Sequence, residues 1–111
     1  MEEVIDFDVV NIQGRNCVMV ACEKDDLDRI KYLIKRGGSV HVVDGDGNSC
    51  LHLACNGQHV EIIKYLLDEG LDPKRGNKWN FTCLHNACYG KNVKLEILEM
   101  LLNAGADINA Q

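Results

Sequence analysis

The residues best suited to chemistry are two short cysteine and histidine clusters, CLHLAC at residues 50–55 and CLHNAC at residues 83–88. Thiolates and imidazoles are ligands that zinc accepts in proteins. On a helix with about 3.6 residues per turn, however, Cys50 and Cys55 point about 140° apart. These two thiols and His52 between them cannot converge on one ion, so we expect no metal site.

The rest of the sequence contains no stronger candidate for a catalytic site. The sequence contains no glycine-rich phosphate loop, HExxH, GxSxG or positioned pair of carboxylates. Ser49 and Thr82 stand three residues before His52 and His85, but a hydroxyl there is placed to cap a helix rather than to act as a nucleophile. We expect no active site, no cofactor and no enzymatic activity.

The spacing of the cysteines shows that the chain is repetitive, which is the property that decides its fold. Cys17, Cys50 and Cys83 are separated by steps of 33 residues, and so are Cys22, Cys55 and Cys88. The same step relates three further sets, namely Asn11, Asp44 and Asn77; Ala21, Ala54 and Ala87; and Leu27, Val60 and Val93. Three copies of one unit are therefore present.

Each copy predicts two amphipathic helices and a projecting loop. The second apolar run of a copy has helical spacing, as at Leu27, Ile30, Leu33 and Ile34. This helix should end at Gly37, Gly70 or Gly105, because glycine adopts the left-handed terminating conformation at little cost. Polar stretches rich in turn formers follow at residues 38–49 and 70–82 and predict hairpin loops. A helix pair cannot bury its apolar face alone, so the copies must stack as a solenoid.

These residues resemble the ankyrin repeat. Residues 44–70, DGDGNSCLHLACNGQHVEIIKYLLDEG, closely follow that family's consensus, with Ser-Cys-Leu-His where Thr-Pro-Leu-His is usual. The resemblance implies an all-α ankyrin-repeat solenoid of stacked helix-turn-helix units with projecting β-hairpin loops. We expect one domain over residues 1–111, with a leading hairpin strand at 4–10 and repeats at 11–43, 44–76 and 77–111.

Three departures from the family pattern carry expectations of their own. Met19 replaces the motif histidine in repeat 1, which suits a terminal unit that caps the array. Repeat 3 has two extra residues between Val93 and Leu98, which predict a lengthened turn between its helices. The position of the consensus glycine between the helices holds Asp25, Gln58 and Lys91, and in repeats 2 and 3 a glycine stands one position earlier, at Gly57 and Gly90.

The six cysteines are expected to be reduced. Packed helices lie roughly 8 to 10 Å apart, whereas a disulfide needs its Cα atoms within about 7 Å. Equivalent cysteines of neighbouring repeats should therefore stay unpaired and act as small core residues. This expectation fits a cytoplasmic or nuclear location, where disulfides are rare.

The resemblance also implies where a partner would bind, because loop tips and the exposed face of the first helix form the gripping surface in ankyrin proteins. In repeat 3 these positions are Lys78, Trp79, Phe81 and Tyr89. Exposed aromatic residues often dominate interfaces; the alternative is that one of them folds back over its hairpin. The matching positions in repeats 1 and 2, which could also be merely solvated, are Ile12, Gln13, Arg15, Glu23, Lys24, Asp46, Asn48 and Asn56.

Other family positions imply structural roles. The resemblance makes His52 and His85 braces that link the first helix to the adjacent loop, with Ser49 and Thr82 as helix caps. It also makes Asn109 a candidate for hydroxylation by an oxygenase, against the alternative that it serves only the hairpin.

The composition of the chain limits the class of partner that it could bind. The formal charge of −5 disfavours nucleic acid, and no stretch approaches the roughly 18 apolar residues that a membrane span requires. We expect binding of a protein partner. The alternatives are a targeting or substrate-recruiting fragment of a larger enzyme, ubiquitin ligase adaptor or channel, and a metal-dependent switch through the cysteines. Leu98, Leu101 and Leu102 lack a following repeat, which predicts further C-terminal repeats or self-association.

Overall fold

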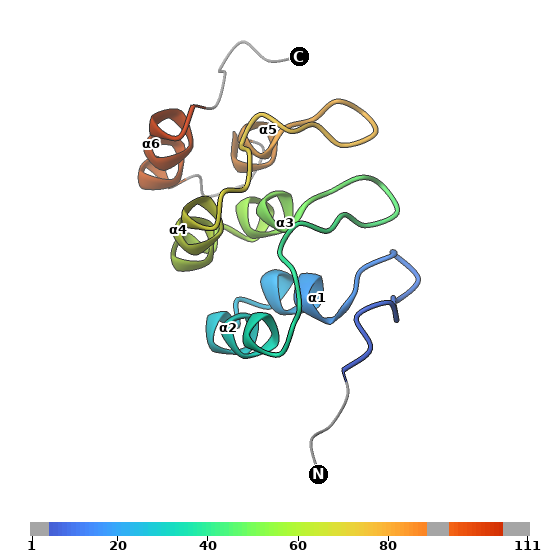
Figure 1. Cartoon of the computed structure of the whole chain (residues 1–111). Helices are drawn as coiled ribbons and strands as arrows, with labels where there is room; N and C mark the ends of the chain where they lie inside the picture. The colour runs from blue at the N-terminus through green and yellow to red at the C-terminus, as the bar shows by residue number, and fades with distance from the viewer. Residues whose placement is uncertain (1–4, 89–93, 106–111) are drawn as a thin grey trace.

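The chain folds into three helix pairs stacked side by side, as the computed structural model of residues 5–88 and 94–105 shows (Figure 1). The first helices form one layer, the second helices form another, and long loops project from the first layer (Figure 1). The helices are α1 (Cys17–Glu23), α2 (Leu27–Lys35), α3 (Cys50–Gly57), α4 (Val60–Asp68), α5 (Cys83–Cys88) and α6 (Leu95–Asn103). In the part of the chain that the structure describes, no helix is long and apolar enough to cross a membrane.

Local signals in the sequence determine where the helices begin and end. Asn16 caps α1 by accepting from the Met19 N–H group at 3.1 Å, and Asp26 caps α2 in the same way. The helix-terminating glycines predicted from the sequence are confirmed, because Gly37, Gly70 and Gly105 have φ values of 102°, 90° and 101°. Only glycine adopts these angles without strain.

The turn within each of the first two repeats keeps its left-handed residue at the family position. Asp25 and Gln58 occupy the position of the consensus glycine and have φ values of 57° and 56°. Gly57, one residue earlier, has no positive φ and is needed for space instead. A Cβ atom on Gly57 would lie 2.3 Å from Nε2 of His59. The displaced glycine therefore changes the packing of the turn and leaves its backbone geometry intact.

Repeat 3 departs from the strict period at its second helix. Helix α4 begins at residue 60, 33 residues after α2 at residue 27, but α6 begins at residue 95, 35 residues after α4. Leu95, rather than Val93, therefore corresponds to Val60. The lengthened turn expected here falls largely on residues 89–93, which include Lys91 and lie outside the described residues.

The leading segment differs from the strand expected at residues 4–10. Residues 5–10 contain a turn at Phe7 and Asp8 and no strand. The Asp8 N–H group donates to Asp6 Oδ1 at 2.9 Å, a local bond that competes with strand pairing. Within the described residues the projecting loops hold one isolated bridge, between Val43 and Ser49, and no extended strand. The hairpins are shaped by their turns rather than by paired strands.

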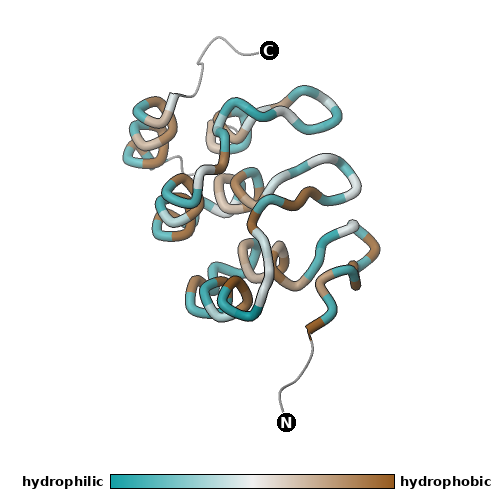
Figure 2. Tube along the Cα trace, in the orientation of Figure 1, coloured by the Kyte–Doolittle hydropathy of each residue, from teal (hydrophilic) through white to brown (hydrophobic). Residues whose placement is uncertain are grey.

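The core lies between the two layers and between successive repeats. Apolar residues recur along every helix, and polar residues interrupt them at short intervals along α2, α4 and α6 (Figure 2). The closest packing between repeats involves the first helices, α1 against α3 and α3 against α5. Fully buried large side chains include Met19, Ile30, Leu51, Ile62, Ile63, Leu66, Ile97 and Leu101.

Candidate partner-binding surface

Three projecting loops, here called fingers 1, 2 and 3 (residues 9–15, 42–48 and 75–81), share one hydrogen-bond pattern. In finger 1, Asn11 Oδ1 accepts from the N–H groups of Gln13 and Arg15, each at 3.0 Å. Asp44 and Asn77 make the equivalent pairs of bonds at 2.9–3.0 Å. The repeated Asn and Asp positions therefore give each finger the same tip.

Neighbouring fingers are joined through their backbones. The Gly45 N–H group donates to Gln13 O at 3.0 Å, and the Lys78 N–H group donates to Asp46 O at 2.9 Å. The three fingers lie side by side on the same side of the first-helix layer (Figure 1). Together they form one continuous, hydrogen-bonded surface.

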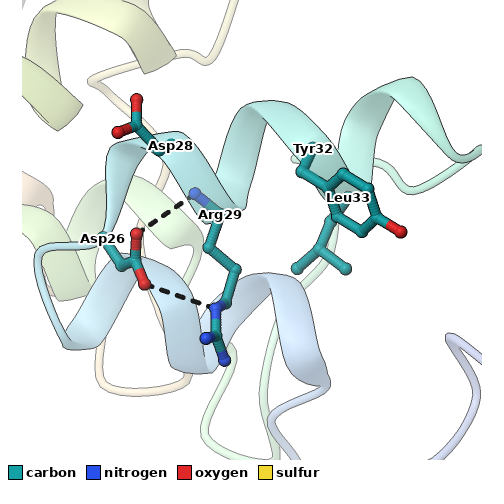
Figure 3. A pocket seen from close by; sticks show the side chains of 5 residues that line it. All are labelled: Asp26, Asp28, Arg29, Tyr32 and Leu33. Atoms are coloured by element: carbon teal, nitrogen blue, oxygen red, sulfur yellow. Dashed lines mark hydrogen bonds and ion pairs between the residues drawn. The ribbon is translucent and has the colours of Figure 1, made fainter.

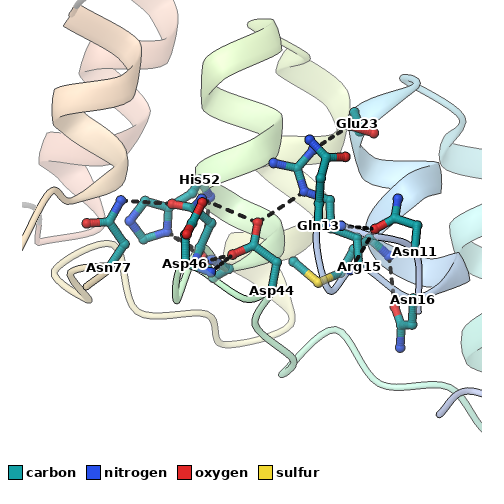
Figure 4. A network of polar contacts seen from close by, with 12 residues as sticks. Asn11, Gln13, Arg15, Asn16, Glu23, Asp44, Asp46, His52 and Asn77 are labelled. Atoms are coloured by element: carbon teal, nitrogen blue, oxygen red, sulfur yellow. Dashed lines mark hydrogen bonds and ion pairs between the residues drawn. The ribbon is translucent and has the colours of Figure 1, made fainter. Parts of the chain in front are cut away.

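A buried ion-pair network fixes finger 1 to finger 2 and to α1 (Figure 4). Arg15 Nε lies 3.0 Å from Asp44 Oδ2, and its Nη1 bonds to Glu23 Oε2. The side chains of Arg15 and Asp44 are only 14% and 1% exposed. Burial alone would raise the pKa of Asp44, but hydrogen bonds from Asn48, Arg15 and Asp46 outweigh it and lower that pKa.

This network bears on two residues that were predicted as partner contacts. The guanidinium of Arg15 and the carboxylate of Glu23 bind to each other, so neither group faces solvent alone. A second side-chain bond, from Asn77 Nδ2 to Asn48 Oδ1 at 2.9 Å, holds finger 3 against finger 2. These polar residues position the surface.

Exposed apolar side chains gather on the fingers. Of the nine large apolar side chains that are exposed in the described residues, six belong to fingers 1–3 and three to the second helices. The six are Val9, Val10, Ile12, Val43, Trp79 and Phe81, and the other three are Tyr32, Leu95 and Leu102. Because the fingers otherwise consist mainly of polar turn residues, this concentration makes them a candidate contact surface.

The two aromatic residues of finger 3 remain accessible, although each has an intramolecular contact. Trp79 is 55% exposed and Phe81 is 44% exposed. Lys78 Nζ lies 4.6 Å from the centre of the Trp79 ring and 2.8 Å from Asp46 Oδ1. The Phe81 ring stacks on His85 with its centroid at 5.3 Å. These contacts orient both rings and leave them open to solvent.

His52 links helix α3 to finger 3 from beneath. Its Nδ1 accepts from the Ser49 N–H group at 3.1 Å, so Nε2 carries the proton and donates to Phe81 O at 2.8 Å. Burial lowers the pKa of His52 below its usual value of 6.5, which keeps the ring neutral. In repeat 3 the His85 Nδ1 is likewise within 3.0 Å of the N–H group and the hydroxyl of Thr82.

The remaining predicted contacts differ in exposure. Gln13, Lys24 and Asn56 are exposed, whereas Asp46 and Asn48 are half-buried between fingers. Tyr89 and Asn109 lie outside the described residues.

Sequence reasoning missed two features of the surface. Val9, Val10 and Val43 extend the apolar area next to the tips, and the repeated Val-Val pairs at residues 9–10 and 42–43 were a signal that could have revealed it. It also missed His59, whose Nε2 is 3.0 Å from Glu23 O and whose Nδ1 is 3.7 Å from Asp25 Oδ1. That link ties repeat 2 to the inter-helix turn of repeat 1.

A hollow on α2 provides a contrast to the fingers (Figure 3). It measures about 480 Å³ and is lined by Asp26, Asp28, Arg29, Tyr32 and Leu33, all from one helix and its cap. Asp26 and Arg29 pair with each other at 3.3 Å across its rim. Within residues 5–88 and 94–105, no three His, Cys, Asp or Glu side chains are grouped to hold a metal ion.

Comparison with known proteins agrees with this architecture. A family model described as ankyrin repeats, in three copies, matches residues 3–73 and 18–111, which together cover nearly the whole chain. A search of curated proteins gave no significant match. The chain therefore belongs to the ankyrin-repeat family, whose repeats are general protein-interaction modules and typically non-catalytic.

Proposed function

We propose that this chain binds a protein partner along fingers 1–3, with Trp79 and Phe81 as the principal contacts. The observation that carries the proposal is the concentration of exposed apolar side chains on the fingers, with aromatic residues at finger 3. Tryptophan is among the residues that most often dominate binding energy, since its large ring buries much area with little loss of rotamer freedom.

The hydrogen bonds between fingers favour this use of the surface. Gly45 and Lys78 each donate to the preceding finger, and Arg15 and Asn77 add side-chain links. A surface that is already ordered loses little conformational entropy when a partner docks. The fingers therefore present their apolar side chains in a fixed arrangement.

The apolar contacts have two main centres, on the outer fingers, with the less exposed Val43 on finger 2. Val10 and Ile12 lie on finger 1, and Trp79 and Phe81 lie on finger 3, with Asp46 and the half-buried Asn48 between them on finger 2. We infer a partner that offers apolar groups to both outer fingers and hydrogen-bond donors to the middle one. The formal charge of −5 on the chain favours a neutral or basic partner surface.

An affinity pull-down from a cell lysate would test the proposal and supply a partner. The test variant is Trp79→Ala with Phe81→Ala, and the matched control is Tyr32→Ala. Tyr32 is also a large exposed aromatic residue, 52% exposed, but it lies on α2. We expect proteins retained by the wild type and by the Tyr32→Ala variant to be lost from the double variant.

Circular dichroism of all three proteins would first establish equal folding. If every specifically retained protein binds the double variant as well as the wild type, finger 3 is not the binding surface. Loss in the Tyr32→Ala variant alone would place the surface on the second helices instead.

A further inference from the structure

The exposed large apolar side chains outside the fingers lie on the first and last repeats of the described stack. Tyr32 on α2 is 52% exposed, and Leu95 and Leu102 on α6 are 74% and 42% exposed. Within the stack, the corresponding positions are half-buried, at Tyr65, Val60 and Leu67. Positions that pack between repeats are therefore exposed on the outer sides of repeats 1 and 3.

One side of each second helix faces the following repeat and carries a charged residue between two apolar ones. Residues at i, i+4 and i+7 share one side of a helix. The three rows at these positions are Leu27, Lys31 and Ile34; Val60, Lys64 and Leu67; and Leu95, Glu99 and Leu102. Lys31 Nζ lies 5.8 Å from the centre of the Tyr65 ring, and the row on α4 lines a groove of about 550 Å³ shared with α6. On the outer side of repeat 3, a glutamate thus stands where both inner rows have a lysine.

The opposite side of each second helix faces the preceding repeat, and repeat 1 carries a different residue there. Ile62 on α4 and Ile97 on α6 are 0% and 1% exposed. Their equivalent on α2 is Arg29, whose side chain is 68% exposed. Arg29 borders a hollow of about 350 Å³ that Val20 and Leu33 also line. The outer side of repeat 1 therefore combines an apolar hollow with a positive charge.

These two outer sides are complementary to each other. A copy of the chain placed after repeat 3, at the spacing of the inner repeats, would bring Glu99 to the position that Lys31 has beside Tyr65. Tyr32 of that copy would take the place of Tyr65, with Arg29 one helical turn before it on the same side. Arg29 Nε is directed at Asp26 at 3.3 Å, and the guanidinium has further N–H donors for a second carboxylate.

Charge also selects between the ways in which two copies could meet. Two copies joined through their repeats 3 would set Glu99 against Glu99, and two joined through their repeats 1 would set Arg29 against Arg29. Like charges at an interface disfavour association. Only the contact between unlike ends pairs opposite charges and covers apolar side chains on both faces.

We propose that copies of this chain associate head to tail, with repeat 3 of one copy packed on repeat 1 of the next and Glu99 paired with Arg29. A contact between two different faces does not close on itself unless the rotation between copies forms a ring. The stack therefore lengthens as the concentration rises. The fingers project from the first-helix layer (Figure 1), so the contact leaves their tips accessible and each added copy lengthens the row of fingers.

Sedimentation velocity of the full chain over a wide range of concentration tests this proposal. We expect the average mass of the wild type to rise continuously with concentration and to pass the dimer. Arg29→Glu and Glu99→Arg should each weaken association about tenfold or more, because each places like charges across the contact. An equal mixture of the two variants should regain the association of the wild type, since every contact in an alternating stack then joins opposite charges.

The matched control is Glu96→Arg, which makes the same charge change on α6 at a residue that lines the groove with α4. This variant should associate like the wild type, and circular dichroism would establish that all the variants are folded. The proposal is overturned if the wild type stays monomeric or stops at the dimer, or if Glu96→Arg weakens association as much as Glu99→Arg does. It is equally overturned if a single variant associates like the wild type or if the mixture does not recover. Retention of partners by the fingers is measured separately and does not depend on these outcomes.

Discussion

At the scale of single residues, the fingers are held by a few buried polar side chains with several partners each. Asp44 accepts from Asp46, Asn48 and Arg15, while His52 joins Ser49 to Phe81. A buried polar group of this kind is costly to leave unpaired. Protonation of such groups should therefore loosen the base of the fingers.

The pH dependence of stability should report on His52. Because burial lowers its pKa in the folded state, the unfolded chain takes up the proton first, near pH 6.5. The free energy of unfolding should fall as pH drops below about 6.5 and level off below the folded pKa. Asp44, whose folded pKa is also lowered, should add a separate loss below about pH 4.

Urea unfolding between pH 7.5 and 5 would measure this effect. The His52→Gln variant should be about 1 to 3 kcal/mol less stable at pH 7.5, since its buried partners lose their bonds. The same variant should show a flatter pH profile below 6.5. His41→Gln, at an exposed position, is the control. An unchanged slope in the His52 variant would contradict this assignment.

The residue roles that could be predicted from the sequence are those of residues that recur with the 33-residue period. The 33-residue step of Asn11, Asp44 and Asn77 foretold three equal tips, because each side chain caps its own turn. Arg15 was predicted as a partner contact, but it pairs with Glu23 within repeat 1 and with Asp44, which becomes its neighbour only when repeat 2 stacks on repeat 1. The sequence pattern of one repeat does not predict the contacts that form between repeats.

At the scale of elements, the helices could be bounded from the sequence more reliably than the loops. Glycine signals predicted the ends of α2, α4 and α6, because their left-handed backbone is a local property. The strand at residues 4–10 could not be excluded from sequence, since its β-branched residues suit a strand until a local Asp6 bond competes. The onset of α6 shifted because an insertion moves register without changing the apolar pattern.

Two substitutions in the inter-helix turns test the role of glycine there: Asp25→Gly should raise the free energy of unfolding, and Gly57→Ala should lower it. Asp25 has a φ of 57°, which costs a non-glycine residue about 1 to 2 kcal/mol. Glycine would relieve this cost but adds about 0.5 to 1 kcal/mol of unfolded-state entropy. We expect Asp25→Gly to raise the free energy of unfolding by about 0.5 kcal/mol, as measured by urea denaturation.

Gly57→Ala should do the reverse. Its Cβ atom would lie 2.3 Å from Nε2 of His59 and would displace the ring from Glu23 O. A loss of about 1 to 3 kcal/mol is expected from the broken bond and the crowding. If both substitutions change stability in the same direction, backbone strain and steric room have been assigned to the wrong residues.

At the scale of the whole molecule, the stack is close to one-dimensional, so each repeat depends mainly on its neighbours. Helix α3 packs against both α1 and α5, whereas α5 packs against α3 and its own partner α6. The alanines at the repeated position, Ala54 and Ala87, are 0% and 1% exposed. Replacing alanine with a larger residue should therefore destabilise more helices at position 54 than at position 87.

Ala54→Leu should disturb both interfaces of the middle repeat and lower the protection of backbone amides throughout α1–α6. Ala87→Leu should disturb the packing of α5 alone among the first helices, so that α5 and α6 lose protection while α1–α4 keep theirs. Overpacking of this kind costs about 1 to 3 kcal/mol at either site. Native-state hydrogen exchange read by mass spectrometry separates the two patterns. Uniform loss of protection in Ala87→Leu would mean that the three repeats unfold as one cooperative body, and that the fingers owe their order to the whole stack rather than to adjacent pairs.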